Sequence, residues 1–261
     1  MKKMIALLLA ALMIAGLTAC GNKAAADSDM AYVKDKGTLI VGITDFAPMD
    51  YKDDNGEWIG FDADMAKAFA KELGVACEFV EINWDTKANE LSSKSIDVVW
   101  NGMTLTDEVK KSMGTSNAYC NNAQVVVVKA EVADQYATAG DCADLTFAVE
   151  SGSAGEAAVA DLGYEYVSVT TQADALMEVS SGTSDACVID LLMAGAMIGE
   201  GTSYADLAYT AELTTEEYGV GFRVGSDLVG ALNDFFAKAY KDGSMMDCAK
   251  TYGVHASIVA Q

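Results

Sequence analysis

Basic residues are scarce in this sequence of 261 residues, in which 17 Lys and Arg stand against 39 Asp and Glu and give a formal charge of −22. A polyanion needs a basic footprint on its partner, so we expect no nucleic-acid binding and no docking on anionic lipid through a basic face. The single proline excludes proline-rich recognition segments and collagen-like repeats. Because half of the residues are apolar, the chain is not a disordered acidic tail.

Histidine is almost absent, since His255 near the C-terminus is the only one. The sequence also has no GxSxG motif, no Ser/His/Asp order, no metal-binding triad and no phosphate-binding loop. We therefore expect no catalytic residue, no metal and no cofactor. After the first 20 residues no apolar run approaches the ~18 residues of a membrane-spanning helix.

The first 20 residues have the pattern of an export signal. Lys2 and Lys3 precede an apolar run over residues 4–17, which is shorter than the ~20 residues that span a bilayer. The run ends in Leu-Thr-Ala-Cys at 17–20, which resembles a bacterial lipobox. By that resemblance residues 1–19 are a lipoprotein signal peptide and Cys20 is acylated and anchors the chain to the cell membrane. The alternative is an ordinary secretory signal with a chance cysteine.

Residues 20–31 are small and polar, which predicts a flexible tether. Five cysteines follow it, an odd number without CxxC or zinc-ligand spacing. Cys77 and Cys187 lie in apolar, strand-like runs, so we expect them to be buried free thiols. The sequence leaves open a disulfide between two of the five.

From residue 38 onward, short apolar strands alternate with amphipathic helices, which predicts an α/β fold. One expected helix begins with Asp62 as its N-cap and ends at Gly74. The other expected helices cover residues 87–93, 153–162, 173–180, 191–198 and 228–241, with a short one after Thr106. The expected strands are 39–43, 77–82, 96–100, 125–128, 145–149, 186–189 and 218–224.

Six motifs in order carry a resemblance to a known family. They are VGITDFAPMDY at 41–51, GFDADMA at 60–66, ID…WNGMTLT at 96–106, AVESGS at 148–153, DACVID at 185–190, and YGVGF at 218–222 with Asp-Gly at 242–243. In this order the chain resembles the extracytoplasmic solute-binding proteins of amino-acid ABC importers, the polar-amino-acid-binding family. The resemblance covers nearly all of the predicted mature chain.

The resemblance implies a type II periplasmic-binding-protein fold, with mixed sheets flanked by helices in two lobes and a ligand in the cleft between them. Lobe 1 would comprise residues 32–118 plus 219–261, and lobe 2 residues 124–214, with a two-strand hinge at 119–123 and 215–218. Such clefts close around the ligand by hinge motion. The implied partners are an amino acid or related amine, an ABC permease and its ATPase, and we expect a monomer.

Several side chains become candidate ligand contacts through this resemblance. Phe46 and Trp84 would offer aromatic faces to an apolar or cationic ligand group, although both would also suit a core. Asn101, Gly102 and Thr104 are expected on a loop between a strand and the next helix, where ligands collect in open α/β sheets. The resemblance assigns the Gly102 carbonyl and the Thr104 hydroxyl to the ligand ammonium, and the Thr104 amide to a carboxylate.

Asp190 ends an apolar strand, where an unpaired carboxylate would be costly. The resemblance gives it the ligand's α-ammonium, through a charge-assisted hydrogen bond, and the alternative is a cap for the next helix. Ser153 and Ala154 open a helix whose free N–H groups suit an anion. In relatives such amides hold the α-carboxylate, and the alternative is a plain glycine-rich turn.

The sequence departs from the family pattern at Val109. The family usually has an arginine there that clamps the carboxylate, and Lys110 and Lys111 follow at other angles around the helix. Glu150 adds a negative charge, so that Asp190, Glu150 and Asp50 would make the cleft acidic. We therefore expect a basic amino acid or a cationic amine as ligand. A neutral amino acid held by the helix end alone is the alternative.

Two other function classes compete with transport. The same fold can serve a ligand-binding sensor, and a few dehydratases share it, so fold by itself does not exclude catalysis. Asp190 or Glu150 could act as a general acid or base only with a raised pKa and a bound substrate. A neighbouring permease gene would favour transport, and a neighbouring sensor-kinase gene would favour signalling.

Overall fold

The structure, a computed structural model, describes residues 28–261. The predicted signal peptide and Cys20 therefore lie outside the described residues, as does most of the predicted tether. The tether prediction reached residue 31, but α3 (Asp29–Lys36) already begins at Asp29, with the Ser28 side chain accepting from the Ala31 N–H as its cap. Residues 29–31 of the predicted tether are therefore helical.

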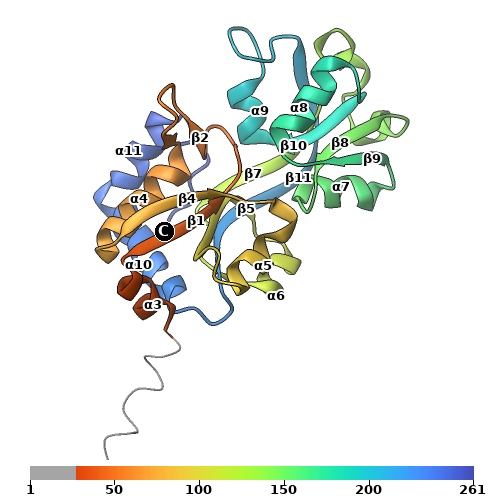
Figure 1. The fold of residues 1–261 in the computed structure, drawn as a ribbon. Helices are drawn as coiled ribbons and strands as arrows, with labels where there is room; N and C mark the ends of the chain where they lie inside the picture. Colours follow the sequence, from red (N-terminus) through yellow and green to blue (C-terminus); the bar gives the residue numbers. More distant parts are fainter. Residues whose placement is uncertain (1–27) are drawn as a thin grey trace, which may run out of the picture.

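One mixed sheet of nine strands runs through residues 28–261 in the order β4-β1-β5-β11-β7-β10-β8-β9, with β6 paired to β11. We call the elements around β1, β4 and β5 the first lobe, and those around β8, β9 and β10 the second lobe. Figure 1 shows the two groups apart, with α10 and α11 beside the N-terminal elements of the first lobe. The α/β, two-lobe fold expected from the sequence is confirmed.

The first lobe contains a parallel core of three strands, because β1 pairs in parallel with β4 and with β5. The apolar run of β1 is buried on both faces of the sheet, as such strands are in α/β folds. Its elements are β1 (Thr38–Ile43), β2 (Tyr51–Lys52), β3 (Trp58–Ile59), α4 (Phe61–Leu73), β4 (Ala76–Glu81), α5 (Lys87–Ser92), β5 (Val98–Thr104), α6 (Asp107–Ser112), β6 (Gly114–Thr115), α10 (Leu228–Asp242) and α11 (Ser244–Thr251).

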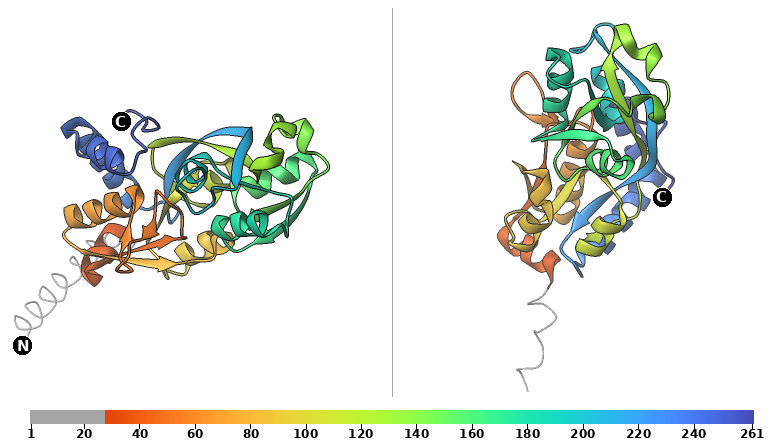
Figure 2. Two further views of the ribbon diagram at one scale, coloured as in Figure 1. Left: turned by 90° about the horizontal axis from the view of Figure 1, so that it is seen from above. Right: turned by 90° about the vertical axis from the view of Figure 1, so that its right-hand side faces the viewer.

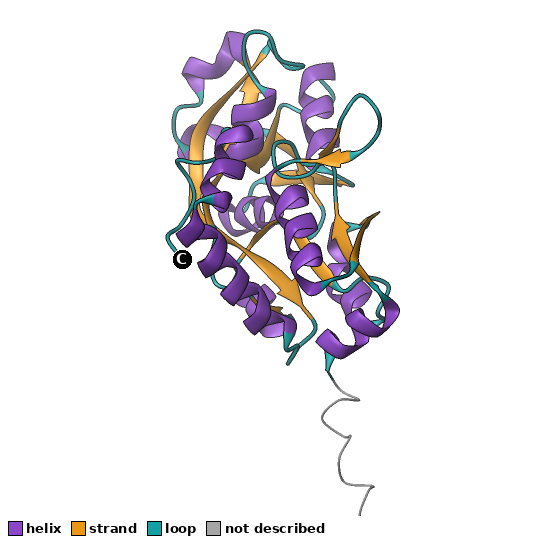
Figure 3. Cartoon of the chain, turned by 90° about the vertical axis from the view of Figure 1, so that its left-hand side faces the viewer, coloured by secondary structure: helices purple, strands orange, loops and turns teal. Residues whose placement is uncertain are grey.

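The second lobe repeats the arrangement with β10, β8 and β9, which pair in parallel. Strand β9 is the edge of the sheet and is mostly exposed. The elements are β8 (Thr146–Glu150), α7 (Ala154–Leu162), β9 (Glu165–Val169), α8 (Gln172–Ser181), β10 (Ala186–Asp190) and α9 (Leu191–Met197). Figure 3 shows helices on both sides of the strands in each lobe.

Two long antiparallel strands, β7 (Cys120–Lys129) and β11 (Leu207–Phe222), connect the lobes. β11 pairs with β5 at one end, and β7 pairs with β10 at the other. Figure 2 shows the lobes at opposite ends of this strand pair when the molecule is seen from above. The register of β7 against β11 shifts twice, between Tyr209 and Glu212 and between Glu212 and Thr214. The assignment of the hinge to 119–123 and 215–218 stays a prediction.

Two local predictions about the first lobe were wrong. Helix α4 has Gly60 rather than Asp62 as its N-cap, and Asp62 is fully buried in the first turn. Residue 60 must be glycine, because its φ is +125° and a Cβ there would lie only 2.1 Å from the Met49 carbonyl oxygen. Strand β5 continues to Thr104 rather than ending at residue 100, because its end pairs with β11 at Tyr218 and Gly219. Asn101, Gly102 and Thr104 therefore lie on the strand end and not on a loop.

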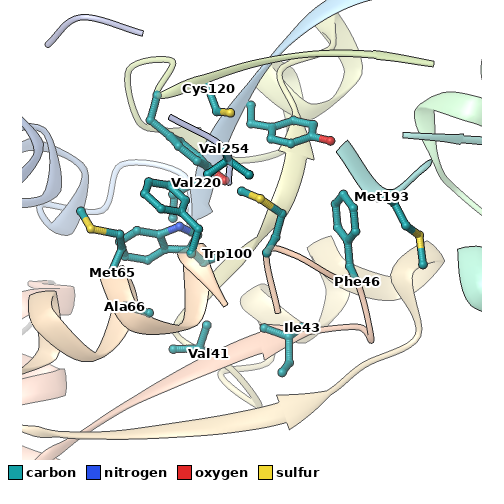
Figure 4. Close-up of a cluster of buried hydrophobic side chains, with 14 of the residues drawn as sticks. Val41, Ile43, Phe46, Met65, Ala66, Trp100, Cys120, Met193, Val220 and Val254 are labelled. Atoms are coloured by element: carbon teal, nitrogen blue, oxygen red, sulfur yellow. The ribbon is translucent and has the colours of Figure 1, made fainter. Parts of the chain in front are cut away.

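The apolar core of the first lobe is built from aromatic side chains of distant segments. Trp100 is fully buried in this core (Figure 4). Its ring meets that of Phe236 edge-on, with ring centroids 5.5 Å apart. Complete burial of such a side chain contributes about 1.5–3 kcal/mol relative to exposure. Figure 4 also shows Phe46 as one of the side chains of this cluster.

All five cysteines of the described chain are free thiols. Cys187 is buried, as expected, whereas Cys77 is only half-buried because β4 is an edge strand. Within residues 28–261 no helix combines the length and the apolar character that crossing a membrane requires.

Candidate functional site

A cleft of about 590 Å³ lies between the two lobes. The first lobe contributes the ends of β1 and β5 and parts of α5 and α6, and the second lobe contributes the ends of β8 and β10 and the start of α7. Nine of the ten predicted ligand contacts line it: Phe46, Trp84, Asn101, Gly102, Thr104, Glu150, Ser153, Ala154 and Asp190. The tenth, Asp50, was wrongly placed there, because it is fully buried behind Asn101 and accepts a hydrogen bond from that side chain.

Phe46 and Trp84 are both core and cleft residues. The two interpretations of the sequence, core packing and a place in the cleft wall, therefore do not exclude each other. They line the cleft with only 2% and 7% of their surface exposed. Phe46 is fixed edge-on against Tyr218, with ring centroids 6.3 Å apart. Gly102, at φ +55°, lies under the Phe46 ring, where a Cβ would come within 2.3 Å of it. The ring position therefore depends on glycine at residue 102.

The polar groups at the end of β5 are already paired within the protein. The Asn101 side-chain oxygen accepts from the backbone N–H and the hydroxyl of Thr44, at 2.8 and 2.7 Å. The Thr104 hydroxyl donates to Glu216 on β11 at 2.8 Å. Glu216 was missed in the sequence, since a charged residue in the polar run before Tyr218 carries no local signal.

Asp190 is the most heavily hydrogen-bonded side chain of the cleft. Its carboxylate accepts from Tyr218 Oη at 2.6 Å and Gln124 Nε2 at 3.0 Å, and from the amides of Asn122 and Gln172. It precedes α9 but makes no side-chain cap bond, so it does not act as a helix cap. Burial, and next the charge of Glu216, raise the pKa of Asp190 to about 7.

Glu150 lies beside Asp190 at the end of β8 and is 2% exposed. Its Oε1 atom is buried without a hydrogen-bond partner. Burial, and next the charge of Asp190, raise the pKa of Glu150 to about 8, while the Lys87 ammonium opposes the shift. A buried carboxyl oxygen without a hydrogen-bond partner carries a desolvation cost that no hydrogen bond within the described chain offsets.

Lys87 lines the cleft and was missed by the sequence analysis. It begins α5 and is only 9% exposed, with Nζ donating to the carbonyl oxygens of Trp84 at 3.0 Å and Gly152 at 2.9 Å. The ammonium also lies 4.8 Å from the centroid of the Trp84 ring, in a cation–π arrangement. Burial lowers the pKa of Lys87, and Glu150 is the strongest opposing influence. A lone lysine at the start of a helix gives no sequence signal of burial.

The first turn of α7 faces the cleft but is partly capped by its own residues. The Ser153 hydroxyl oxygen accepts from the Glu156 N–H at 3.0 Å, and the Glu156 carboxylate accepts from the Gly152 N–H at 2.7 Å. Ser153 and Ala154 line the cleft beside these bonds. The remaining N–H groups of this turn are free by helix geometry.

The model of the bacterial extracellular solute-binding proteins, family 3, matches residues 39–255. The chain belongs to that family. This solute-binding protein is 32% identical to the L-cystine-binding protein TcyJ of Escherichia coli (strain K12) over 219 residues, 82% of this chain and 81% of that protein. It is also 32% identical to the arginine-binding extracellular protein ArtP of Bacillus subtilis (strain 168) over 251 residues, 93% and 92% of the two chains.

Solved structures give the same assignment. An ancestral arginine-binding protein bound to arginine is 34% identical to this solute-binding protein, with a TM-score of 0.77 over 83% of this chain and 98% of that one. Because the relatives named for cystine and for arginine are equally identical to it, overall similarity does not select a ligand. The residues that line the cleft have to make that distinction.

The cleft of this solute-binding protein is strongly acidic. Val109, at the position where the family resemblance expects arginine, lines the cleft with an apolar side chain. Lys110 and Lys111 are exposed and do not line it. Among the described residues Lys87 is the only basic side chain in the lining. Six carboxyl groups line it: Asp85, Asp107, Glu108, Glu150, Glu156 and Asp190.

Proposed function

We propose that this chain is an extracytoplasmic substrate-binding lipoprotein of an ABC importer that captures a cationic amino acid, of the arginine class, in the cleft between its lobes. The proposal of a cationic ligand rests on the residues that line the cleft, which have six carboxyl groups and one ammonium group. An anionic or neutral ligand would leave this imbalance in place. A cationic ligand would reduce it.

Glu150 and Asp190 are the proposed partners of the ligand's positive charge. The unpartnered Oε1 atom of Glu150 supports this, since a guanidinium or ammonium group would supply the missing donor. Hydrogen bonds between charged groups are about twice as strong as neutral ones. The faces of Phe46 and Trp84 would cover the remaining surface of such a cation, which adds about 0.5–2 kcal/mol depending on desolvation.

Lys87 makes an amino acid a better candidate than an amine without a carboxylate. An ammonium group has three N–H donors, and two of those of Lys87 are used by carbonyl oxygens. The third, with the N–H group of Ala154 at the start of α7, could hold a carboxylate group in place of the missing arginine. This proposed contact separates the two ligand types that the sequence left open.

The proposed cellular role follows from family membership and the predicted lipobox. Acylated Cys20 would hold the chain at the outer side of the cell membrane, and closure of the lobes would be the signal that a permease, driven by its ATPase, recognises. The relatives named above are binding proteins, which supports binding rather than catalysis. A sensor that delivers the ligand signal to a receptor is the alternative use of the same cleft.

Thermal shift and calorimetry on residues 21–261 test the ligand class. The panel comprises L-arginine, L-lysine, L-cystine, L-glutamine, L-glutamate and agmatine, which is arginine without its carboxylate. A ligand at 100 times its dissociation constant adds about 2.7 kcal/mol of stability. We expect L-arginine or L-lysine to give this shift and agmatine a smaller one. Stabilisation by glutamate or glutamine alone would refute the cationic ligand.

A further inference from the structure

Two amide side chains of β7 meet two carboxyl groups from the neighbouring strands. β7 lies between β10 of the second lobe and β11 in the sheet. Gln124 is opposite Asp190 in the register with β10, and Asn122 is opposite Glu216 in the register with β11. Since residues two apart on a strand point to the same face, the four side chains gather on one face of the sheet. Gln124 and Asp190 line the cleft there, whereas Asn122 and Glu216 lie outside its lining.

Each of the two amide nitrogens donates to both carboxyl groups. Gln124 Nε2 donates to Asp190 Oδ1 at 3.0 Å and to Glu216 Oε1 at 2.8 Å. Asn122 Nδ2 donates to the same two oxygen atoms, at 2.5 and 2.7 Å. A side-chain amide has two N–H donors, so all four N–H groups are used among these four side chains. We call Asn122, Gln124, Asp190 and Glu216 the amide–carboxyl ring.

The amide–carboxyl ring fixes the direction in which the Gln124 amide faces. An ionised carboxyl group accepts hydrogen bonds and has no donor to offer. If the amide were turned over, its oxygen would take the place of Nε2, which is 2.8 and 3.0 Å from the oxygens of Glu216 and Asp190, and it would be repelled by both. Glu216 is itself held in place by the Thr104 hydroxyl of the first lobe. It therefore adds a second acceptor that keeps Nε2 turned away from the rest of the cleft.

This orientation leaves the Gln124 side-chain oxygen, Oε1, without a donor among residues 28–261. The corresponding oxygen of Asn122 accepts from the Leu192 N–H at 3.3 Å and so has a partner. Gln124 lines the cleft although only 2% of its surface is exposed. Its Oε1 atom lies against the first turn of α7, where a Cβ on Gly155 would come within 2.9 Å of it. A buried acceptor without a partner is costly, so this oxygen is suited to a donor of the ligand.

We infer that Gln124 Oε1 accepts a hydrogen bond from the α-ammonium group of the ligand, beside Asp190, and that Glu216 keeps this oxygen turned toward the ligand. The inference rests on the proposed function, because it requires a ligand with an ammonium group. An ammonium group has three N–H donors and no acceptor, so a turned-over Gln124 would present a donor to a donor. Glu216 is a positioning residue, since it does not line the cleft and acts through Gln124.

Two ligands that differ only in the α-ammonium group test the contact with Gln124. They are L-arginine and 5-guanidinopentanoate, which is arginine without that group, and calorimetry at pH 8 measures both. Gln124→Met removes Oε1 and keeps a side chain of similar length. We expect its Kd for L-arginine to rise about tenfold or more, and its Kd for 5-guanidinopentanoate to change much less. If Gln124→Met does not fold, the Gln124 side-chain carbonyl carbon of the wild type gives the answer by NMR, because L-arginine should shift it and 5-guanidinopentanoate should not.

A double-mutant cycle tests whether Glu216 acts through Gln124. Glu216→Leu removes the second acceptor and should weaken L-arginine binding, whereas the double variant with Gln124→Met should bind no more weakly than Gln124→Met alone. Glu216→Gln should lie closer to the wild type than Glu216→Leu does. Its amide oxygen still accepts from Gln124, and its amide nitrogen takes the place of Oε2 beside the Thr214 hydroxyl. Glu217→Leu, at the next and exposed position of β11, is the control.

Nitrogen-15 NMR of the ligand-free chain measures the role of Glu216 separately. Both side-chain N–H protons of Gln124 should resonate downfield of those of exposed amides, and one of them should move back in Glu216→Leu. An unchanged Gln124 amide in that variant would overturn the role of Glu216. Equal losses of affinity for the two ligands in Gln124→Met would overturn the ammonium contact while L-arginine still bound the wild type. If the wild type bound no cationic amino acid, the proposed function and the ammonium contact would both be refuted.

Discussion

The ammonium nitrogen of Lys87 lies 2.9 Å from the backbone carbonyl oxygen of Gly152. Lys87 begins α5 in the first lobe, and Gly152 precedes α7 in the second, so this hydrogen bond crosses the cleft. Asp85 adds a backbone contact at the same place, because a Cβ on Gly152 would lie 2.7 Å from the Asp85 Cα. The residues around Lys87 thus hold the two lobes together at one edge of the cleft.

Replacement of Lys87 by methionine should weaken L-arginine binding. The variant keeps most of the length of the side chain but loses the cross-lobe hydrogen bond and the proposed carboxylate contact. A hydrogen bond to a charged group contributes about 1.5–3 kcal/mol, so we expect a roughly ten- to hundredfold increase in Kd for L-arginine by calorimetry. Agmatine should lose less, because it has no carboxylate. Lys111→Met, on the exposed side of α6, is the control. If L-arginine and agmatine lost affinity equally, Lys87 would contribute to lobe closure and not to a carboxylate contact.

Gly152→Ala tests whether ligand binding needs the contact with Asp85. At φ +72° an alanine is strained by about 1–2 kcal/mol. Gly163, which ends α7, has the same φ of +72° but open space around it, so Gly163→Ala carries the strain without the clash. We expect similar losses of stability in urea unfolding for the two variants. Only Gly152→Ala should weaken L-arginine binding, by tenfold or more, because its methyl group prevents complete closure.

Glu150→Gln should separate stability from binding. The folded-state pKa of Glu150, about 8, is above the usual value of a glutamate. Protonation of Glu150 therefore stabilises the folded chain, and this stabilisation is lost as the pH rises through 8. At pH 9 we therefore expect Glu150→Gln to be more stable than the wild type in urea unfolding. The same variant should bind L-arginine at least tenfold more weakly. Glu165→Gln, on exposed β9, should change neither property.

Cation binding should release protons. The acid forms of Glu150 and Asp190 predominate below their pKa values of about 8 and 7, and a cationic ligand favours the ionised forms. The affinity for L-arginine should therefore rise between pH 6 and pH 8, by up to tenfold per pH unit for each proton released. Calorimetry in two buffers of different ionisation enthalpy measures the release. A flat affinity profile without buffer dependence would contradict the assignment of these carboxyl groups to the ligand.

Much of the fold could be predicted from residue order. The apolar run of β1, the periodic apolar face of α10 and the glycine that ends α4 are local patterns, and each produced the expected element. The predictions failed for elements whose extent depends on contacts with distant segments of the chain. Strand β5 is longer than its apolar run because β11 supplies hydrogen bonds, and β9 and α11 were not anticipated.

The candidate site shows the same division. The family resemblance named nine residues that line the cleft, and the absence of arginine at Val109 was visible in the sequence. The sequence could not show that Lys87 is buried beside Glu150, or that Asp50 lies behind the cleft with Asp62. A sequence shows which residues are charged, but not which of them lie close together in the folded chain. Chain folding brings residues 87, 150 and 190 together in the cleft, and their burial then shifts their pKa values.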